Sequence, residues 1–138
     1  MKLYLAPLEG ITNHIYRKAL YECFGGFDKY FIPFIRAKQN LNFSGREKKD
    51  IDPENNQGMY AVPQILTRNA EDFLRTASQL AGLGYREINL NLGCPSKTVV
   101  TKGCGAGFLD RPDELERFLE HIFADIDLKI SIKTRLGM

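Results

Sequence analysis

Residues 87–95 read Glu-Ile-Asn-Leu-Asn-Leu-Gly-Cys-Pro, and this stretch carries the strongest signal for the fold. Apolar residues alternate in it with Asn89 and Asn91, so the apolar side chains face one way and the amides the other. A buried parallel strand is usually apolar on both faces. Amides on one face, just before a glycine and a cysteine, therefore indicate a strand that ends in a functional site.

Four further apolar runs with strand-like composition flank this one, at residues 3–8, 30–35, 60–66 and 129–134. Segments with helical spacing separate most of them, at residues 15–23, 69–84 and 110–122. We expect Ile15, Ala19, Leu20 and Cys23 to form the apolar face of the first of these helices, and Asn69 and Asp110 to cap the other two. Residues 36–58 are polar and show no clear helix; a short helix followed by an exposed loop is one interpretation. Alternation of strand and helix predicts βα units and a parallel sheet.

Polar residues with one parity recur in the neighbouring runs. Gln64 lies in the third run, and Ser131, Lys133 and Arg135 alternate with apolar residues at the end of the fifth. Polar side chains at the carboxyl ends of several strands mark the active site of a (β/α)8 barrel. Because such a barrel has eight strands and about 250 residues, five runs predict an incomplete barrel of about five βα units or a smaller open sheet. Scattered polar residues on an exposed sheet face are the alternative interpretation of the pattern.

The composition is that of a globular protein, with 43% hydrophobic and 26% charged residues among 138. The net charge of +2 neither demands nor excludes a nucleic-acid partner. Three cysteines indicate reduced thiols, and no apolar run approaches the ~20 residues of a membrane span. From the reduced thiols and the lack of an apolar span we expect a soluble cytoplasmic protein. We expect no bound metal, because His14 and His121 lack the spacing of metal ligands.

Cys94 begins a long glycine-rich segment that extends to Gly107. Long connections inside a compact domain are usually functional. Pro95 has a fixed φ and restricts the residue before it, so the Cys94 thiol is expected on a stiff turn. We expect Cys23 and Cys104 to be structural, and the basic residues at 46–49 to lie in a solvated charged loop.

Four motifs resemble those of the tRNA-dihydrouridine synthases and occur in the same order. Residues 91–95, Asn-Leu-Gly-Cys-Pro, resemble the Asn-x-Gly-Cys-Pro signature, and residues 6–12, Ala-Pro-Leu-Glu-Gly-Ile-Thr, resemble the opening Ala-Pro-Met-x-Gly motif. Residues 62–65 resemble the third strand of that family and residues 132–137 the fifth. Leu8 stands where methionine is usual, Asn13 where aspartate is common, and Cys104 interrupts a loop normally made of small residues.

The resemblance implies the first part, residues 1–138, of an FMN-binding (β/α)8 barrel. The remaining strands, with the flavin phosphate site, and a C-terminal helical tRNA-binding domain are expected to be absent from these residues. It also implies reduction of uridine to 5,6-dihydrouridine in tRNA, with FMN reduced by NADPH. Hydride would go to C6, and Cys94 would donate the proton to C5. A free cysteine has a pKa of about 8.5, so it is mostly protonated at neutral pH.

The same resemblance assigns roles to further residues. Lys133 would lie beside the flavin ring, Gln64 at its edge, and the backbone of Pro7, Leu8 and Glu9 along it. Asn91 would contact the uracil and Arg36 the RNA, although a solvated arginine and an ordinary strand-end lysine are the alternatives for Arg36 and Lys133. Another FMN barrel, such as a dihydroorotate dehydrogenase or a relative of old yellow enzyme, and a catalytically inert fragment are the competing functions. We also expect self-association through the open edges of the sheet.

Overall fold

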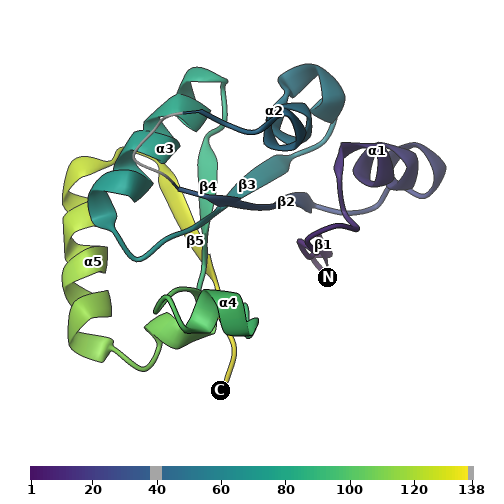
Figure 1. Cartoon of the computed structure of the whole chain (residues 1–138). Helices are drawn as coiled ribbons and strands as arrows, with labels where there is room; N and C mark the ends of the chain where they lie inside the picture. Colours follow the sequence, from purple (N-terminus) through teal and green to yellow (C-terminus); the bar gives the residue numbers. More distant parts are fainter. Residues whose placement is uncertain (38–41, 137–138) are drawn as a thin grey trace.

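A computed structural model describes residues 1–37 and 42–136 and contains five parallel strands, each of the first four followed by helix (Figure 1). The strands are β1 (Tyr4–Leu5), β2 (Lys29–Arg36), β3 (Ala61–Leu66), β4 (Glu87–Asn91) and β5 (Lys129–Lys133). The α-helices are α1 (His14–Cys23), α2 (Gly45–Ile51), α3 (Ala70–Gly82), α4 (Lys97–Val100) and α5 (Pro112–Asp125). Two 3₁₀ turns, η1 (Pro53–Asn56) and η2 (Gly105–Phe108), come after α2 and α4 respectively.

The order of strands in the sheet is β1-β2-β3-β4-β5, the same as their order along the chain. Consecutive parallel neighbours joined by helices are the repeating unit of a (β/α) barrel. The predicted incomplete barrel of five βα units is therefore confirmed. The register aligns Gln64 with Asn89 and Ser131, and Asn91 with Lys133.

The apolar core lies between the sheet and the helices that cover it. Ile65, Ile88 and Leu90 are fully buried and belong to the same cluster as Phe73 of α3 and Phe118 of α5. The rings of Phe73 and Phe118 meet edge to face with centroids 5.8 Å apart. Figure 1 shows α3 and α5 together on one side of the sheet, with α1 beside β1 at the other end. This packing leaves the opposite face of the strands to the polar residues.

Two of the helix ends differ in how well the sequence predicted them. Asn69 caps α3 as expected, since its side chain accepts a hydrogen bond from the backbone N–H of Asp72 at 2.8 Å. The predicted cap at Asp110 is wrong. Pro112 is the first residue of α5, so the N-cap position belongs to Arg111 and Asp110 lies one residue too early. Arg111 makes no side-chain cap bond.

The polar segment between β2 and β3 contains the short helix α2, but the chain after α2 is not an exposed loop. Ser44 and Glu47 form a capping box that starts α2. Asp50 and Asn56, at the end of α2 and in η1, are buried. The basic residues at 46–49 are exposed to solvent as expected, but they lie on helix α2 and not in a loop.

Helix α1 forms as expected, but its apolar face is not the buried one. Ile15 is 66% exposed and Cys23 is exposed, whereas Arg17 is completely buried. Its guanidinium donates hydrogen bonds to the carbonyl oxygens of Thr12 (2.7 Å) and Asp50 (2.6 Å) and to Asn56 Oδ1 (2.9 Å). These bonds attach α1 to α2 and η1, so the buried face of α1 is polar and its apolar face lies in solvent.

Candidate active site

The residues singled out from the sequence gather at the carboxyl ends of the five strands. Residues 7–9 come after β1, Arg36 ends β2, Gln64 lies near the end of β3, and Asn91 and Lys133 end β4 and β5. Cys94 lies three residues after β4. Because the strands are parallel, all of these positions lie at the same end of the sheet, where the carboxyl ends of the strands meet.

The turn that carries Cys94 is held from both sides. The side-chain oxygen of Asn91 accepts hydrogen bonds from the backbone N–H groups of Gly93 (3.2 Å) and Cys94 (3.0 Å). The carbonyl oxygen of Cys94 accepts a bond from the N–H of Ala106 at 3.0 Å. An asparagine that binds the backbone two and three residues ahead stabilises a tight turn. The backbone N–H of the half-buried Cys94 is thus bonded to Asn91 of β4, and its carbonyl oxygen is bonded to Ala106 of η2.

The glycine-rich segment after Cys94 is more ordered than a long loop, since it contains α4 and η2. Gly105 has φ +56° and packs directly on Cys94. A Cβ at Gly105 would lie 2.8 Å from the carbonyl oxygen of Cys94 and 3.1 Å from its Cβ. Only glycine allows η2 to approach Cys94 this closely.

The polar residues of one parity form a connected row on the inner face of the sheet. Asn91 Nδ2 donates to Gln64 Oε1 at 2.8 Å, and Gln64 Nε2 donates to Asn89 Oδ1 at 2.6 Å. Asn89 Nδ2 continues to Ser131 Oγ at 3.0 Å. The predicted convergence of Gln64, Asn89, Asn91 and Ser131 is therefore confirmed. Because each amide nitrogen has two hydrogens, Gln64 and Asn91 each keep one N–H beyond this row.

Lys133 lies next to the Cys94 turn. It is paired with Asn91 in the sheet, its carbonyl oxygen accepts the N–H of Leu92 at 2.9 Å, and the peptide of residues 133–134 packs against Gly93. Its exposed ammonium group has no ion-pair or hydrogen-bond partner in the part of the chain that the structure describes. An inner-face cavity of about 270 Å³ is lined by Lys133, Pro7 and Phe31, among other residues. An uncompensated cation beside a partly apolar cavity suits the edge of a planar anionic ring such as that of a reduced flavin.

The other predicted cofactor and RNA residues occupy neighbouring positions. Glu9 and Arg36 line a second cavity, of about 160 Å³, between the ends of β1 and β2 and helix α2. The guanidinium of Arg36 lies 5.3 Å from the centroid of the Phe34 ring. The backbone N–H of Leu8 donates to Thr12 Oγ1 at 2.8 Å and so belongs to the turn after β1. The structure thus brings Pro7 and Lys133 to one cavity, and Glu9 and Arg36 to another.

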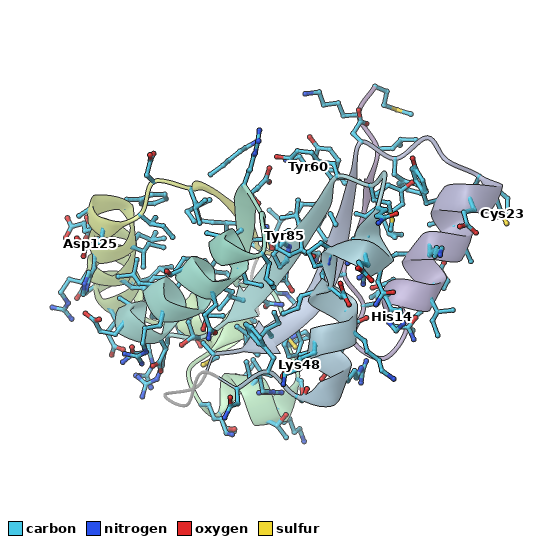
Figure 2. The ribbon with its side chains drawn as sticks, turned by 90° about the horizontal axis from the view of Figure 1, so that it is seen from above. His14, Cys23, Lys48, Tyr60, Tyr85 and Asp125 are labelled. Carbon is cyan, nitrogen blue, oxygen red and sulfur yellow. The ribbon has the colours of Figure 1, made fainter. Side chains whose placement is uncertain are left out.

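The two remaining cysteines differ from each other, and Cys23 contradicts its expected role. Cys23 is exposed at the end of α1 (Figure 2), which contradicts a buried structural role. Cys104 is half-buried, and burial raises the pKa of its thiol even though Arg68, Arg36 and Lys102 oppose the shift. Cys104 is therefore held as a neutral thiol near a group of cations.

A charged cluster at the other end of the inner face was not predicted. The buried carboxylate of Glu87 contacts the ammonium groups of Lys29 at 2.7 Å and Lys129 at 3.2 Å, and Tyr60 Oη donates to it at 3.1 Å. Burial alone would raise the pKa of Glu87, but hydrogen bonds from Lys29, Ser131 and Lys129 outweigh it and hold the pKa below its ordinary value. Glu87 lies two residues before Asn89 in the same strand, so the sequence could have placed its side chain on the inner face with those of the amides.

Two further observations on the described residues concern membrane spans and metal ligands. No helix among them is long and apolar enough to cross a membrane. Within residues 1–37 and 42–136, no group of three or more His, Cys, Asp or Glu side chains is placed to hold a metal ion. His14 instead contacts Asp50, and His121 contacts Glu71 and Asp125, each at 3.3 Å.

Comparison with known proteins agrees with the geometry. Residues 4–138 match the family described as dihydrouridine synthase. The chain is 33% identical to the tRNA-dihydrouridine(16) synthase of Ralstonia nicotianae, with 99% of this chain and 44% of that protein aligned. It is also 33% identical to the probable tRNA-dihydrouridine synthase of Staphylococcus aureus, with 96% of this chain and 40% of that protein aligned. The chain therefore spans about two fifths of the length of these curated relatives.

Proposed function

Because this chain belongs to the dihydrouridine synthase family, we propose that it contributes to flavin-dependent reduction of uridine to 5,6-dihydrouridine in tRNA. In this proposal residues 1–138 are the N-terminal part of an FMN-binding barrel, and tRNA is the substrate. The observation that carries the proposal is the placement of Cys94 on a clamped turn next to Lys133, at the edge of the sheet where barrel enzymes have their active sites.

Cys94 is the proposed proton donor to C5 of uridine. The thiol is half-buried, and its backbone is held by Asn91 on one side and Ala106 on the other. A general acid must be held within reach of the atom that it protonates. The proposed role therefore makes use of the rigidity of this turn.

The residues around Lys133 fit FMN, which when reduced would supply the hydride for C6. The Lys133 ammonium would stabilise negative charge on the flavin ring, and Pro7 would line the ring. Gln64 and Asn91 each keep one amide N–H for a ligand, which suits the proposed contacts of Gln64 with the flavin and of Asn91 with the uracil. NADPH is the proposed reductant of the flavin.

Arg36 is the proposed contact to the RNA backbone, since it lines an open cavity at the same edge of the sheet. Self-association through the edge strands β1 and β5 stays a prediction, which size-exclusion chromatography of the purified protein checks. A monomeric elution volume would contradict it.

The first experiment is a titration of the protein with FMN, followed by quenching of flavin fluorescence. Saturable binding is expected, and Lys133→Ala should weaken it about tenfold or more, since a hydrogen bond or ion pair to a charged group is removed. Lys129→Ala removes the same charge from the opposite end of β5, where the ammonium contacts Glu87, and should leave the FMN affinity unchanged. Equal effects of the two substitutions would contradict the proposed place of the flavin.

The second experiment measures dihydrouridine in unmodified tRNA by mass spectrometry after incubation with the protein, FMN and NADPH. Cys94→Ala should lower the rate by about 100-fold or more, the usual contribution of a general acid. Cys23→Ala is the matched control, because Cys23 is an exposed thiol on α1. Full activity of the Cys94 variant would exclude Cys94 as the proton donor.

A further inference from the structure

We infer that Ser131 and Asn89 are positioning residues for Cys94, acting through a row of hydrogen bonds that crosses three strands of the sheet. The inference rests on the proposed role of Cys94 as proton donor. The row runs through Ser131, Asn89, Gln64, Asn91 and the backbone N–H groups of Gly93 and Cys94.

The direction of every bond in this row follows from its Cys94 end. There, Asn91 must present its oxygen, because a backbone N–H can only donate. Its nitrogen therefore faces Gln64 and requires the oxygen of that side chain. The nitrogen of Gln64 then faces the oxygen of Asn89, and the nitrogen of Asn89 donates to Ser131 Oγ at the other end of the row.

Burial makes these bonds costly to break. Gln64 is 1% exposed, Asn89 2% and Asn91 7%. A buried amide that loses its partner keeps most of the cost of leaving water. Each side chain therefore holds its neighbour in one orientation, and bonds that all point the same way strengthen one another.

The Ser131 end of the row lies beside a charged cluster on the same face of the sheet. Ser131 lines the same cavity as Glu87 and Lys29. Lys29, Lys129 and Tyr60 all contact the Glu87 carboxylate. The bond from Asn89 to Ser131 ties the row, and through it the turn of Cys94, to strand β5.

The same interior could have been filled without polar groups. Bulky branched side chains usually occupy the inner layers of such barrels. Three amides and a hydroxyl at these positions stabilise a single arrangement only if all of them are hydrogen-bonded. The last bond of the row is the one between Asn91 and the backbone N–H of Cys94. We therefore assign Ser131 and Asn89 to the positioning of this turn.

The test compares three serine substitutions by the rate at which iodoacetamide alkylates Cys94. The rate is measured by peptide mass spectrometry and divided by the rate for Cys23, an exposed thiol at the end of α1 (Figure 2). Ser131→Ala removes the hydroxyl oxygen that accepts the hydrogen bond from Asn89, on a half-buried position of an edge strand where folding should survive. Ser131→Thr keeps the hydroxyl. Ser96→Ala is the matched control, since Ser96 lies two residues from Cys94 and its hydroxyl pairs with that of Thr98, outside the row.

Ser131→Ala should loosen the turn and raise the Cys94 to Cys23 ratio about two- to tenfold, the factor that corresponds to one net hydrogen bond. The exchange of the Gly93 and Cys94 amide hydrogens should accelerate by a similar factor, while exchange in α3 stays unchanged. Ser131→Thr and Ser96→Ala should both give the wild-type ratio. A purely structural role of Ser131 would instead accelerate exchange throughout the sheet.

An unchanged ratio in Ser131→Ala, or a larger change in Ser96→Ala, would overturn the inference. Neither measurement requires turnover, so the result is independent of whether the protein makes dihydrouridine. If Cys94→Ala abolishes dihydrouridine formation while Ser131→Ala leaves the ratio unchanged, the proposed function stands and the positioning role is refuted.

Discussion

Gly105→Ala should destabilise the protein and displace Cys94, whereas Gly103→Ala should only destabilise it. Both glycines have positive φ, +56° at Gly105 and +66° at Gly103. An L residue in this left-handed region costs about 1–2 kcal/mol, and this term applies to both variants. The pair therefore separates backbone strain from the contact with Cys94.

The contacts of the new methyl group differ between the two positions. At Gly105 it would lie 2.8 Å from the carbonyl oxygen of Cys94, a distance at which something must move. Overpacking of this kind costs about 1–3 kcal/mol, so the total for Gly105→Ala is about 2–5 kcal/mol. At Gly103 the nearest atoms are 3.3–3.4 Å away, near the ends of the Arg111 and Arg68 side chains, which are exposed and can rotate.

Urea unfolding of the two variants and the wild-type protein gives the free energies, and iodoacetamide labelling reports on Cys94. We expect Gly105→Ala to lose more stability than Gly103→Ala and to change the labelling rate of Cys94, with that of Cys23 unchanged. Equal losses of stability, together with wild-type labelling of Cys94 in Gly105→Ala, would show that η2 does not clamp the cysteine. The reasoning would then be refuted.

Two further predictions concern buried charges. Arg17→Met should lower the free energy of unfolding by about 3–5 kcal/mol, because the buried oxygens of Thr12, Asp50 and Asn56 lose their charged hydrogen-bond donor. Lys18→Met, on the exposed face of the same helix, should change it by less than about 0.5 kcal/mol in the same urea experiment, and a small loss in both would contradict the role of Arg17. Glu87→Gln should reduce the loss of stability in acid: the folded-state pKa of Glu87 lies below its ordinary value of 4.5, so its stabilisation is present above 4.5 and is lost as the pH falls through the folded-state pKa. Urea midpoints from neutral pH to about pH 3 check this sign, and identical pH profiles of the two proteins would be inconsistent with it.

The errors in the sequence interpretation have specific physical causes. The apolar pattern of α1 correctly indicated a helix with Ile15 on its apolar face, but a pattern identifies a face without identifying what covers it. In the described residues that face is exposed, and hydrogen bonds bury Arg17 instead. The helix at 45–51 was only one interpretation of residues 36–58 because it is short and polar, although Ser44 and Glu47 three residues later form a recognisable capping box.

The sequence by itself determined the order of strands and helices and the sides on which strand residues lie. A strand has a period of two residues, so the parity of Gln64, Asn89, Asn91 and Ser131 was enough to place them on one face. Parallel strands joined by helices then brought their carboxyl ends to a single edge. Local patterns carry this information because it depends only on neighbouring residues.

Only the tertiary structure decided which groups touch. The bond from Asn89 to Ser131 joins residues 42 positions apart, and that from Arg17 to Asn56 joins residues 39 apart. Such contacts depend on the register of the strands and on the paths of the connecting segments, which no local pattern specifies. The clamp of Gly105 on Cys94 and the direction of the amide row arise at this level, because they require several segments to be packed at once.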